Sequence, residues 1–392
     1  MKKEDNYIQT SGLVYLPGKN IQDKNKRSKK ADMIIMNSGA KPEEIGRVVA
    51  EIKKSGLRAD VSQGEFRTVI GIVGDERKVD FDRLAALPGV KEARPIEAPY
   101  KLISREFAKM LAPEENIGVI KIKNVTIGGE EPVWIAGPCS VESKAQLNKI
   151  ADGVKKAGAH ILRGGVFKPR SSVHSWQGLG SQGEEEAEEA LSWLKEAGKR
   201  LEMPVVTEAR GETVVDLVAK YSDIIQIGAR NMYNQDLLQA AGKTGLPVFF
   251  KRNFGAGIEE YLSFAEYIAA EGNSKIILCE RGMLPMGKGK AYTRYSLELA
   301  AVPVIQKETF LPILVDPSHG TGRRDLIFDM SCAAMACGAN GLMIECHYNP
   351  AEALVDAAQQ ITPDELKDVI ETCKKIHKVV SEVKKRAKVV VK

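Results

Sequence analysis

Arginine and lysine residues directly follow several short apolar runs of the sequence, as in the segments ILR and FFK. An Arg fork matches carboxylate and phosphate groups, and like charges in one confined site need anions to neutralise them. The pattern therefore predicts a site for phosphorylated ligands that also carry a carboxylate. The six cations concerned are Arg163, Lys168, Arg170, Arg230, Lys251 and Arg281.

Four further residues have the chemistry of metal ligands. Cys139, His319 and Glu345 follow the first, seventh and eighth apolar runs, and Asp356 comes in the next segment. Thiolate, imidazole and carboxylate groups together suit a divalent first-row metal such as Mn, Fe, Co or Zn. His347 is a competing candidate, and the alternative for any Cys or His taken alone is a buried structural residue.

These residues need a scaffold that brings the ends of eight segments to one place. The apolar runs recur about every 30 residues, with helix-like stretches between them. This pattern predicts an α/β fold of the (β/α)8 TIM-barrel type, whose active sites lie at the carboxyl ends of the strands. A doubly wound sheet is the main rival, but the first run leads into AGPCSVES and not into GxGxxG. The expected strands end near Ala136, Leu162, Thr207, Ile227, Phe250, Leu278, Val315 and Ile344.

A smaller unit precedes the barrel at residues 31–100. The segments ADMIIMNSG, LRADVSQ, FRTVIGIVG and VKEARPIEA read as strands, and PEEIGRVVAEIKKSG and DFDRLAALPG read as helices. The resulting order, βαββαβ, is that of a ferredoxin-like domain. Element order alone leaves open whether this domain binds a regulatory ligand, supports assembly or only packs.

The remaining segments connect or extend these two units. We expect a flexible basic arm at residues 1–30, a linker at 101–116, and a barrel at 117–362 that begins with the hairpin IGVIKIKNVTIGG. Residues 363–392 form the C-terminal helix and basic tail, and Thr362, Pro363 and Glu365 have the pattern of a helix start with a capping box.

Composition and charge distribution limit the classes of function. The chain has 392 residues, 43% of them hydrophobic, and a formal net charge of +5. The positive excess lies in the two ends, which argues against nucleic-acid binding by a folded face. Six dispersed cysteines without a CxxC predict a reducing, cytoplasmic compartment, and the polar start and short apolar runs predict neither export nor a membrane span.

Several long motifs resemble 3-deoxy-D-arabino-heptulosonate 7-phosphate (DAHP) synthase. They are IAGPCSVES, LRGGVFKPRSS, SWQGLG, QIGARN, ILCERG, VDPSHGTGRRD and the segment from Glu345 to Asp356. Residues 32–100 also resemble the ferredoxin-like regulatory domain that one branch of this family carries at its N-terminus. The triplet at Lys168, Pro169 and Arg170 favours the heptulosonate enzymes over the sister octulosonate enzymes, which typically have Lys-Ala-Asn-Arg there.

The resemblance implies an aldol-type transferase at the first step of the shikimate pathway of aromatic amino-acid synthesis. Phosphoenolpyruvate would condense with erythrose 4-phosphate and water, at a divalent metal held by Cys139, His319, Glu345 and Asp356. Lys168 is the expected proton donor, and Glu208 is a weaker candidate for positioning water. The implied substrate-binding residues are Arg163, Lys168, Pro169, Arg170, Ser171, Ala229, Arg230, Lys251 and Arg281.

The resemblance also implies feedback by an aromatic amino acid at the N-terminal domain and a homo-oligomer, commonly a tetramer. Three alternatives stay open at this point. Lys168 or Lys251 could form a Schiff base, as in lysine aldolases of this barrel type. The enzyme could use another phosphorylated aldose, or the barrel could be a non-catalytic regulator that binds phosphorylated metabolites, although no expected ligand is missing.

Overall fold

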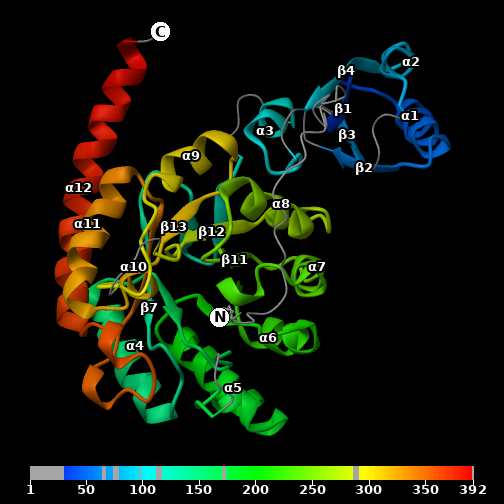
Figure 1. Cartoon of the computed structure of the whole chain (residues 1–392). Coiled ribbons are helices and arrows are strands. Elements are labelled where there is room, and N and C mark those ends of the chain that lie inside the picture. Colours follow the sequence, from blue (N-terminus) through cyan, green and yellow to red (C-terminus); the bar gives the residue numbers. More distant parts are fainter. Residues whose placement is uncertain are drawn as a thin grey trace, which may run out of the picture.

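The computed structural model describes residues 31–63, 68–73, 79–96, 99–111, 117–169, 174–285 and 291–390. The expected flexible arm at 1–30 lies outside these residues. The described chain contains a small antiparallel sheet and a closed eight-stranded parallel barrel, and both were predicted (Figure 1). None of the helices in these ranges is long and apolar enough to cross a membrane.

The small domain has the predicted βαββαβ order. Its antiparallel sheet is ordered β2-β3-β1-β4. Alternating residues of β1 face opposite sides, as the period of two requires. Ile34 and Met36 pack with the helices, whereas Met33 and Ile35 form a cluster on the other face. The elements are β1 (Ala31–Met36), α1 (Pro42–Lys54), β2 (Arg58–Gln63), β3 (Thr68–Val73), α2 (Phe81–Ala85) and β4 (Val90–Ile96).

The barrel strands are short and buried along almost their whole length, which explains why they read as continuous apolar runs. The closed order is β10-β11-β12-β13-β14-β7-β8-β9, so the first and last barrel strands are neighbours. The strands are β7 (Val133–Gly137), β8 (Ile161–Arg163), β9 (Val205–Glu208), β10 (Ile224–Ile227), β11 (Val248–Lys251), β12 (Ile276–Glu280), β13 (Ile313–Val315) and β14 (Gly341–Glu345).

Helices surround the barrel and bury one face against it. In α4, for example, Leu147, Ile150 and Val154 are buried, and Ser143 caps the first turn by accepting a hydrogen bond from the backbone N–H of Gln146. The surrounding helices are α4 (Lys144–Ala157), α5 (Glu184–Arg200), α6 (Val215–Tyr221), α7 (Gln235–Lys243), α8 (Ile258–Ala269), α9 (Ala301–Glu308), α10 (Pro317–Thr321), α11 (Ile327–Cys337) and α12 (Pro363–Val390).

A hairpin closes the amino-terminal end of the barrel. Strands β5 (Ile120–Ile122) and β6 (Val125–Ile127) pair in antiparallel fashion, and their apolar side chains cluster with interior residues of the barrel strands. Gly118 and Gly128 lie against Phe310 and Pro312, which directly precede β13. The opposite end, where the strands terminate, is therefore the end open to ligands.

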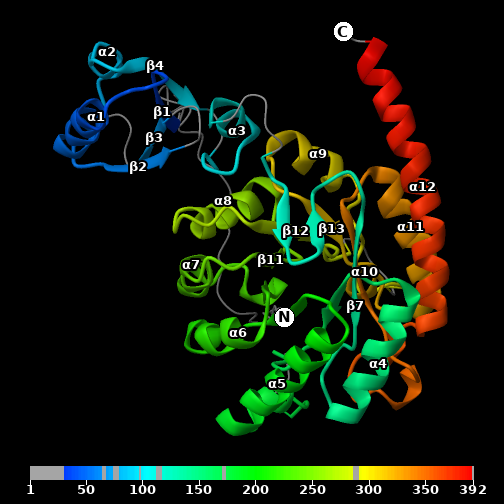
Figure 2. The ribbon, with the colours of Figure 1, turned by 180° about the vertical axis from the view of Figure 1, so that it is seen from behind.

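The last helix begins with a reciprocal capping box. The Glu365 carboxylate accepts a hydrogen bond from the Thr362 backbone N–H at 2.7 Å, and the Glu365 N–H donates to the Thr362 hydroxyl at 3.4 Å. The helix packs along α4 and α11, and its far end projects away from the barrel (Figures 1 and 2).

The segment between the two domains contacts both of them. It includes α3 (Arg105–Leu111), whose Phe107 covers Met33 and Ile35 on the open face of the small sheet. On the barrel side, Tyr100 donates a hydrogen bond to Glu308 of α9 at 2.9 Å, and the Leu102 N–H donates to Glu266 of α8 at 2.7 Å. The linker is thus a docked element and not a free tether.

Glu266 makes the linker contact sensitive to pH. Burial raises the pKa of its carboxyl to about 7, against the opposing effect of the backbone N–H groups of residues 101–103. Because the folded pKa lies above the ordinary value of 4.5, the folded state binds the proton more tightly than the unfolded state. The stability associated with this group is fully present below pH 4.5 and is lost as the pH rises through 7.

We therefore predict that Glu266→Gln removes part of the pH dependence of folding. Between pH 5 and pH 8, the free energy of unfolding of the variant should rise relative to the original chain by about 2 kcal/mol. Urea denaturation at several pH values measures this difference. Glu259→Gln, on the exposed face of the same helix, is the control for the change in charge. A constant difference across the pH range would contradict the prediction.

Candidate active site

A cavity opens at the carboxyl ends of the barrel strands. Its walls come from the carboxyl halves of β8, β9, β10 and β11 and from segments that follow β8, β10, β12, β13 and β14. It contains five of the six cations expected from the sequence, together with Arg294 from the segment after β12. The lining residues are Arg163, Lys168, Pro169, Glu208, Gln226, Gly228, Ala229, Arg230, Lys251, Arg281, Arg294, His319 and Asp356. Arg170 and Ser171 lie outside the described residues.

Close backbone packing at the end of β7 brings the first strands together. Gly137 has φ +154°, and a Cβ atom there would lie 2.0 Å from the carbonyl oxygen of Arg163. Only glycine fits this approach, which places the end of β7 beside the end of β8. Cys139 and Arg163 consequently share a hydrogen bond, from the Arg163 guanidinium to the Cys139 carbonyl oxygen at 3.3 Å.

Buried carboxylates hold two of the cations. Arg163 donates to Glu345 at 2.7 Å, and Lys251 donates to Asp316 at 2.6 Å, with all four side chains buried. Arg281 is also buried, and its Nη1 has no hydrogen-bond partner among the described residues. Arg281 lines the cavity, and its guanidinium therefore keeps a donor that no described residue satisfies.

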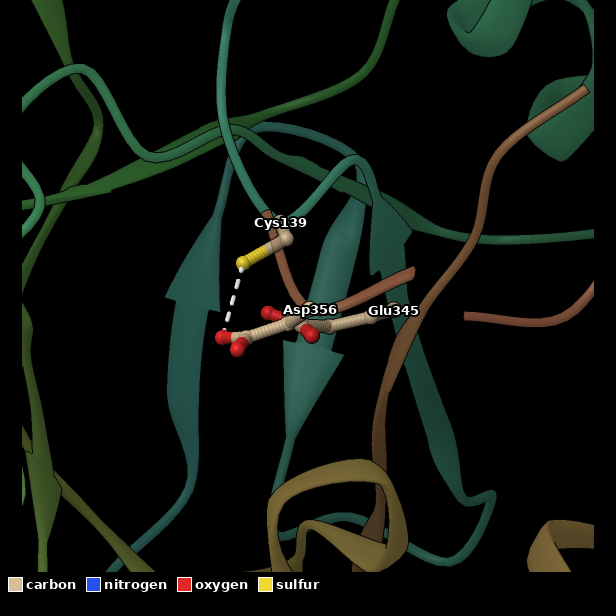
Figure 3. A group of neighbouring side chains, drawn as sticks. All are labelled: Cys139, Glu345 and Asp356. Atoms are coloured by element: carbon tan, nitrogen blue, oxygen red, sulfur yellow. Dashed lines mark hydrogen bonds between the residues drawn. The ribbon is translucent and has the colours of Figure 1, made fainter. Parts of the chain in front are cut away.

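Cys139, Glu345 and Asp356 form a compact group (Figure 3). One potential ligand atom from each residue lies within 4.8 Å of those from the other two. The Cys139 thiol donates to an Asp356 oxygen at 3.4 Å, and Cys139 and Glu345 are buried. A sulfur and two carboxylates at this spacing could hold a metal ion.

His319 lies next to this group. Its Nε2 is 3.4 Å from Glu345 Oε1, and its Nδ1 is 2.7 Å from Asp316 Oδ2. His347 is absent from both the three-residue group and the lining of the cavity. It instead accepts a hydrogen bond from the Asn349 N–H at 3.1 Å and stacks on Tyr348.

The electrostatics of the group suit a bound cation. Burial is the main cause that raises the pKa of the Cys139 thiol well above its ordinary value, and the negative charge of Glu345 raises it further. Burial would also raise the pKa of Glu345, but His319 and Arg163 outweigh it and hold that pKa well below the usual range. A buried thiol beside carboxylates becomes a thiolate when a metal ion supplies positive charge, so the donors present fit a metal.

Lys168 extends into the cavity as a protonated amine. Its side chain passes close to Gly165, where a Cβ atom would lie 2.7 Å from the Lys168 Cδ. Burial would lower the pKa of Lys168, but Cys139 and Glu345 raise it above its ordinary value. Glu208 lies on the cavity wall and accepts a hydrogen bond from Gln226 at 2.8 Å.

Several residues of the site were not singled out from the sequence. Asp316 directly follows β13, so the rule that polar residues after strands form the site would have included it. Gln226 lies within β10, and Arg294 lies in an irregular segment, so neither position stands out in the sequence pattern. Gln359 follows the barrel strands and donates to Glu345 at 2.7 Å.

Comparison with known proteins identifies the family of the chain. Residues 111–382 match the DAHP synthetase I family, and residues 33–98 match the DAHP synthase ferredoxin-like domain. The chain therefore belongs to the DAHP synthase family, in the branch with an N-terminal ferredoxin-like domain. Its activity is that of a phospho-2-dehydro-3-deoxyheptonate aldolase, or DAHP synthase, the first enzyme of the shikimate pathway.

Relatives and solved structures agree with this assignment. The phospho-2-dehydro-3-deoxyheptonate aldolase of Thermotoga maritima is 45% identical over 88% of this chain and 97% of its own length. A crystal structure of DAHP synthase from the same organism covers 90% of this chain and 98% of its own, with 44% identity and a TM-score of 0.68. A 2-dehydro-3-deoxyphosphooctonate aldolase of Syntrophobacter fumaroxidans is 29% identical over 65% of this chain and 90% of its own length.

Proposed function

We propose that this DAHP synthase condenses phosphoenolpyruvate with D-erythrose 4-phosphate and water in a metal-dependent reaction that releases phosphate. The observation that carries the proposal is the concentration of six cations in one cavity, directly beside the Cys139, Glu345 and Asp356 group. Phosphoenolpyruvate carries a phosphate and a carboxylate, and the tetrose carries a second phosphate. These anions offset the positive charge that the protein concentrates there.

The cations divide between the two substrates. Arg163, Lys168, Arg230, Lys251 and Arg281 would bind phosphoenolpyruvate, with Pro169 and Ala229 on the cavity wall. Arg281 supports this role best, because its unpaired Nη1 faces no protein acceptor among the described residues. The family resemblance assigns Arg170 and Ser171 to the phosphate of the tetrose.

Cys139, His319, Glu345 and Asp356 would hold a divalent metal ion, Mn, Fe, Co or Zn. The mixed sulfur, nitrogen and oxygen donors support this assignment. When bound, such an ion supplies Lewis acidity at the aldehyde oxygen of the tetrose.

The protein side chains would orient the reactants and manage the protons. The cations hold phosphoenolpyruvate so that its C3 faces the aldehyde carbon, and a C–C bond forms between these atoms. Water then adds at C2, the bond from C2 to the phosphate oxygen breaks as the C2 ketone forms, and the two protons of the water pass to the leaving phosphate and back to Lys168. Lys168 donates the proton that the aldehyde oxygen takes up, and Glu208 with Gln226 orients the water.

Replacing Lys168 tests the proton-donor role. We predict that Lys168→Met lowers kcat by about 100- to 10,000-fold, because the variant lacks a positioned acid. Cobalt binding, followed by the absorption of the cobalt–thiolate pair, should be retained. Lys195→Met on the exposed surface of α5 is the control and should be fully active. Near-normal turnover of Lys168→Met would show that another group supplies the proton.

Metal removal and a change of sugar test the reaction itself. We predict that chelation abolishes phosphate release from phosphoenolpyruvate and erythrose 4-phosphate, and that adding back a divalent metal restores it. Arabinose 5-phosphate should support little release, as the heptulosonate-type triplet at residues 168–170 implies. Full activity after complete metal removal would refute the metal dependence, and a preference for the five-carbon sugar would refute the assigned substrate.

The small domain would regulate the barrel by binding an aromatic amino acid such as tyrosine or phenylalanine. Two observations support this idea, the match to the DAHP synthase ferredoxin-like domain and the docked linker that contacts both domains.

The chain would also form a homo-oligomer, which the family resemblance suggests is a tetramer. Light scattering of the purified protein measures the number of subunits directly.

We predict that an aromatic amino acid inhibits the full chain but not a shortened chain that begins at residue 99. Phosphate release at increasing concentrations of each amino acid measures this effect. The shortened chain must first retain activity without effector, which establishes that its barrel is intact. Equal responses of the two chains would place the effector site outside the small domain, and no response of the full chain would refute the regulation.

A further inference from the structure

Asp316 lies behind the site, at the junction of β13 and α10. Its side chain is fully buried and does not line the cavity. Asp316 Oδ1 accepts a hydrogen bond from the His319 backbone N–H at 2.9 Å, which fixes the first turn of α10 relative to the strand. The position of His319 therefore depends on Asp316 through the backbone as well as through the side chain.

The second oxygen of Asp316 contacts one residue from each half of the site. Oδ2 lies 2.7 Å from His319 Nδ1, on the side of the proposed metal ligands. The same atom accepts a hydrogen bond from Lys251 Nζ at 2.6 Å, on the side of the proposed phosphoenolpyruvate cations. Both distances are those of charge-assisted hydrogen bonds.

This contact decides which nitrogen of His319 carries the proton. An ionised carboxylate can only accept hydrogen bonds, so the proton of a neutral imidazole lies on Nδ1. Nε2 is then left with its lone pair, and it faces Glu345 Oε1 at 3.4 Å, next to Cys139 and Asp356. Both oxygens of Asp316 already accept hydrogen bonds, Oδ1 from the His319 backbone N–H and Oδ2 from Lys251 Nζ, so this carboxylate also acts as an acceptor toward the imidazole.

Lys251 depends on Asp316 in a different way. Its ammonium group is buried, and a buried charge without a partner is strongly unfavourable. Among the described residues, Asp316 makes the ion pair of Lys251, and it does so without entering the cavity. The pair therefore keeps the Lys251 side chain on the wall of the cavity without filling the cavity itself.

We propose that Asp316 is a positioning residue that joins the two halves of the active site, by presenting His319 Nε2 to the metal and Lys251 to phosphoenolpyruvate. This inference rests on the proposed metal site and goes beyond it, because Asp316 touches neither the metal nor the substrate. One carboxylate thus positions both His319 and Lys251, so its loss should weaken metal binding and anion binding together.

Asp316→Asn tests the inference, because the side-chain amide keeps the shape but removes the charge and one acceptor. The full chain is freed of metal, and cobalt is titrated while the absorption of the cobalt–thiolate pair is recorded. The variant should bind cobalt about 10- to 100-fold more weakly, with altered ligand-field bands. Calorimetry without metal should show that it also binds phosphoenolpyruvate about tenfold more weakly.

Lys251→Met is the matched variant. It removes one of the two partners of Asp316, so phosphoenolpyruvate should bind more weakly while cobalt affinity and the cobalt spectrum stay as in the original chain. An Asp316→Asn variant that binds both ligands normally, or loses only one of them, would overturn the inference. An original chain that shows no cobalt–thiolate absorption would instead refute the proposed metal site, and the inference with it.

A measurement on the original chain avoids any dependence on the folding of variants. The sequence has five histidines, and the nitrogen NMR signals of His319 can be assigned by comparison with His319→Gln. The inference requires the metal-free protein to have a proton on Nδ1 and none on Nε2 at neutral pH. The opposite tautomer would overturn it.

Discussion

Arg163 and Glu345 lie 2.7 Å apart at the carboxyl end of the barrel, and both side chains are buried. Burying either charge alone would be strongly unfavourable, so each can occupy this position only because the other does. Lys251 at the end of β11 is likewise buried and depends on a buried partner, Asp316, which directly follows β13. Pairing of buried charges is thus the condition that allows a cavity so rich in cations to exist in a folded barrel.

Among the described residues, not every cation of the cavity has a carboxylate partner, and the cations without one are those available to bind anionic ligands. Arg281 lacks a partner for Nη1, and Arg230 lies exposed at the mouth of the cavity. Glu345 contacts Arg163, His319 and Gln359, so a cation bound at this carboxylate would add charge to an already positive wall. Under the proposed function, the charges of a bound metal ion and of the anionic substrates would compensate each other, so one cavity would serve both kinds of ligand.

The sequence allowed the barrel, the small domain and much of the candidate site to be predicted, because these follow from local patterns. Arg163, Lys251 and Glu345 are the last residues of buried strands, so their common location depends only on finding the strands. Asp316 satisfies the same rule, but its significance requires knowing that Lys251 and His319 reach a single oxygen atom. Arg294 enters the cavity from an irregular segment, whose path no periodicity determines.

The linker contacts two helices that are neighbours, in the sequence, of the strands that carry Lys251 and Asp316. Glu266 anchors it to α8, the helix that follows β11 and hence Lys251. Glu308 and Thr309 anchor it to the end of α9, which leads into β13 and hence Asp316. A displacement of the small domain would therefore act first on α8, which follows β11 in the chain, and on α9, which precedes β13. Under the proposed regulation, an effector would alter the binding of phosphoenolpyruvate and the geometry of His319 without entering the active site.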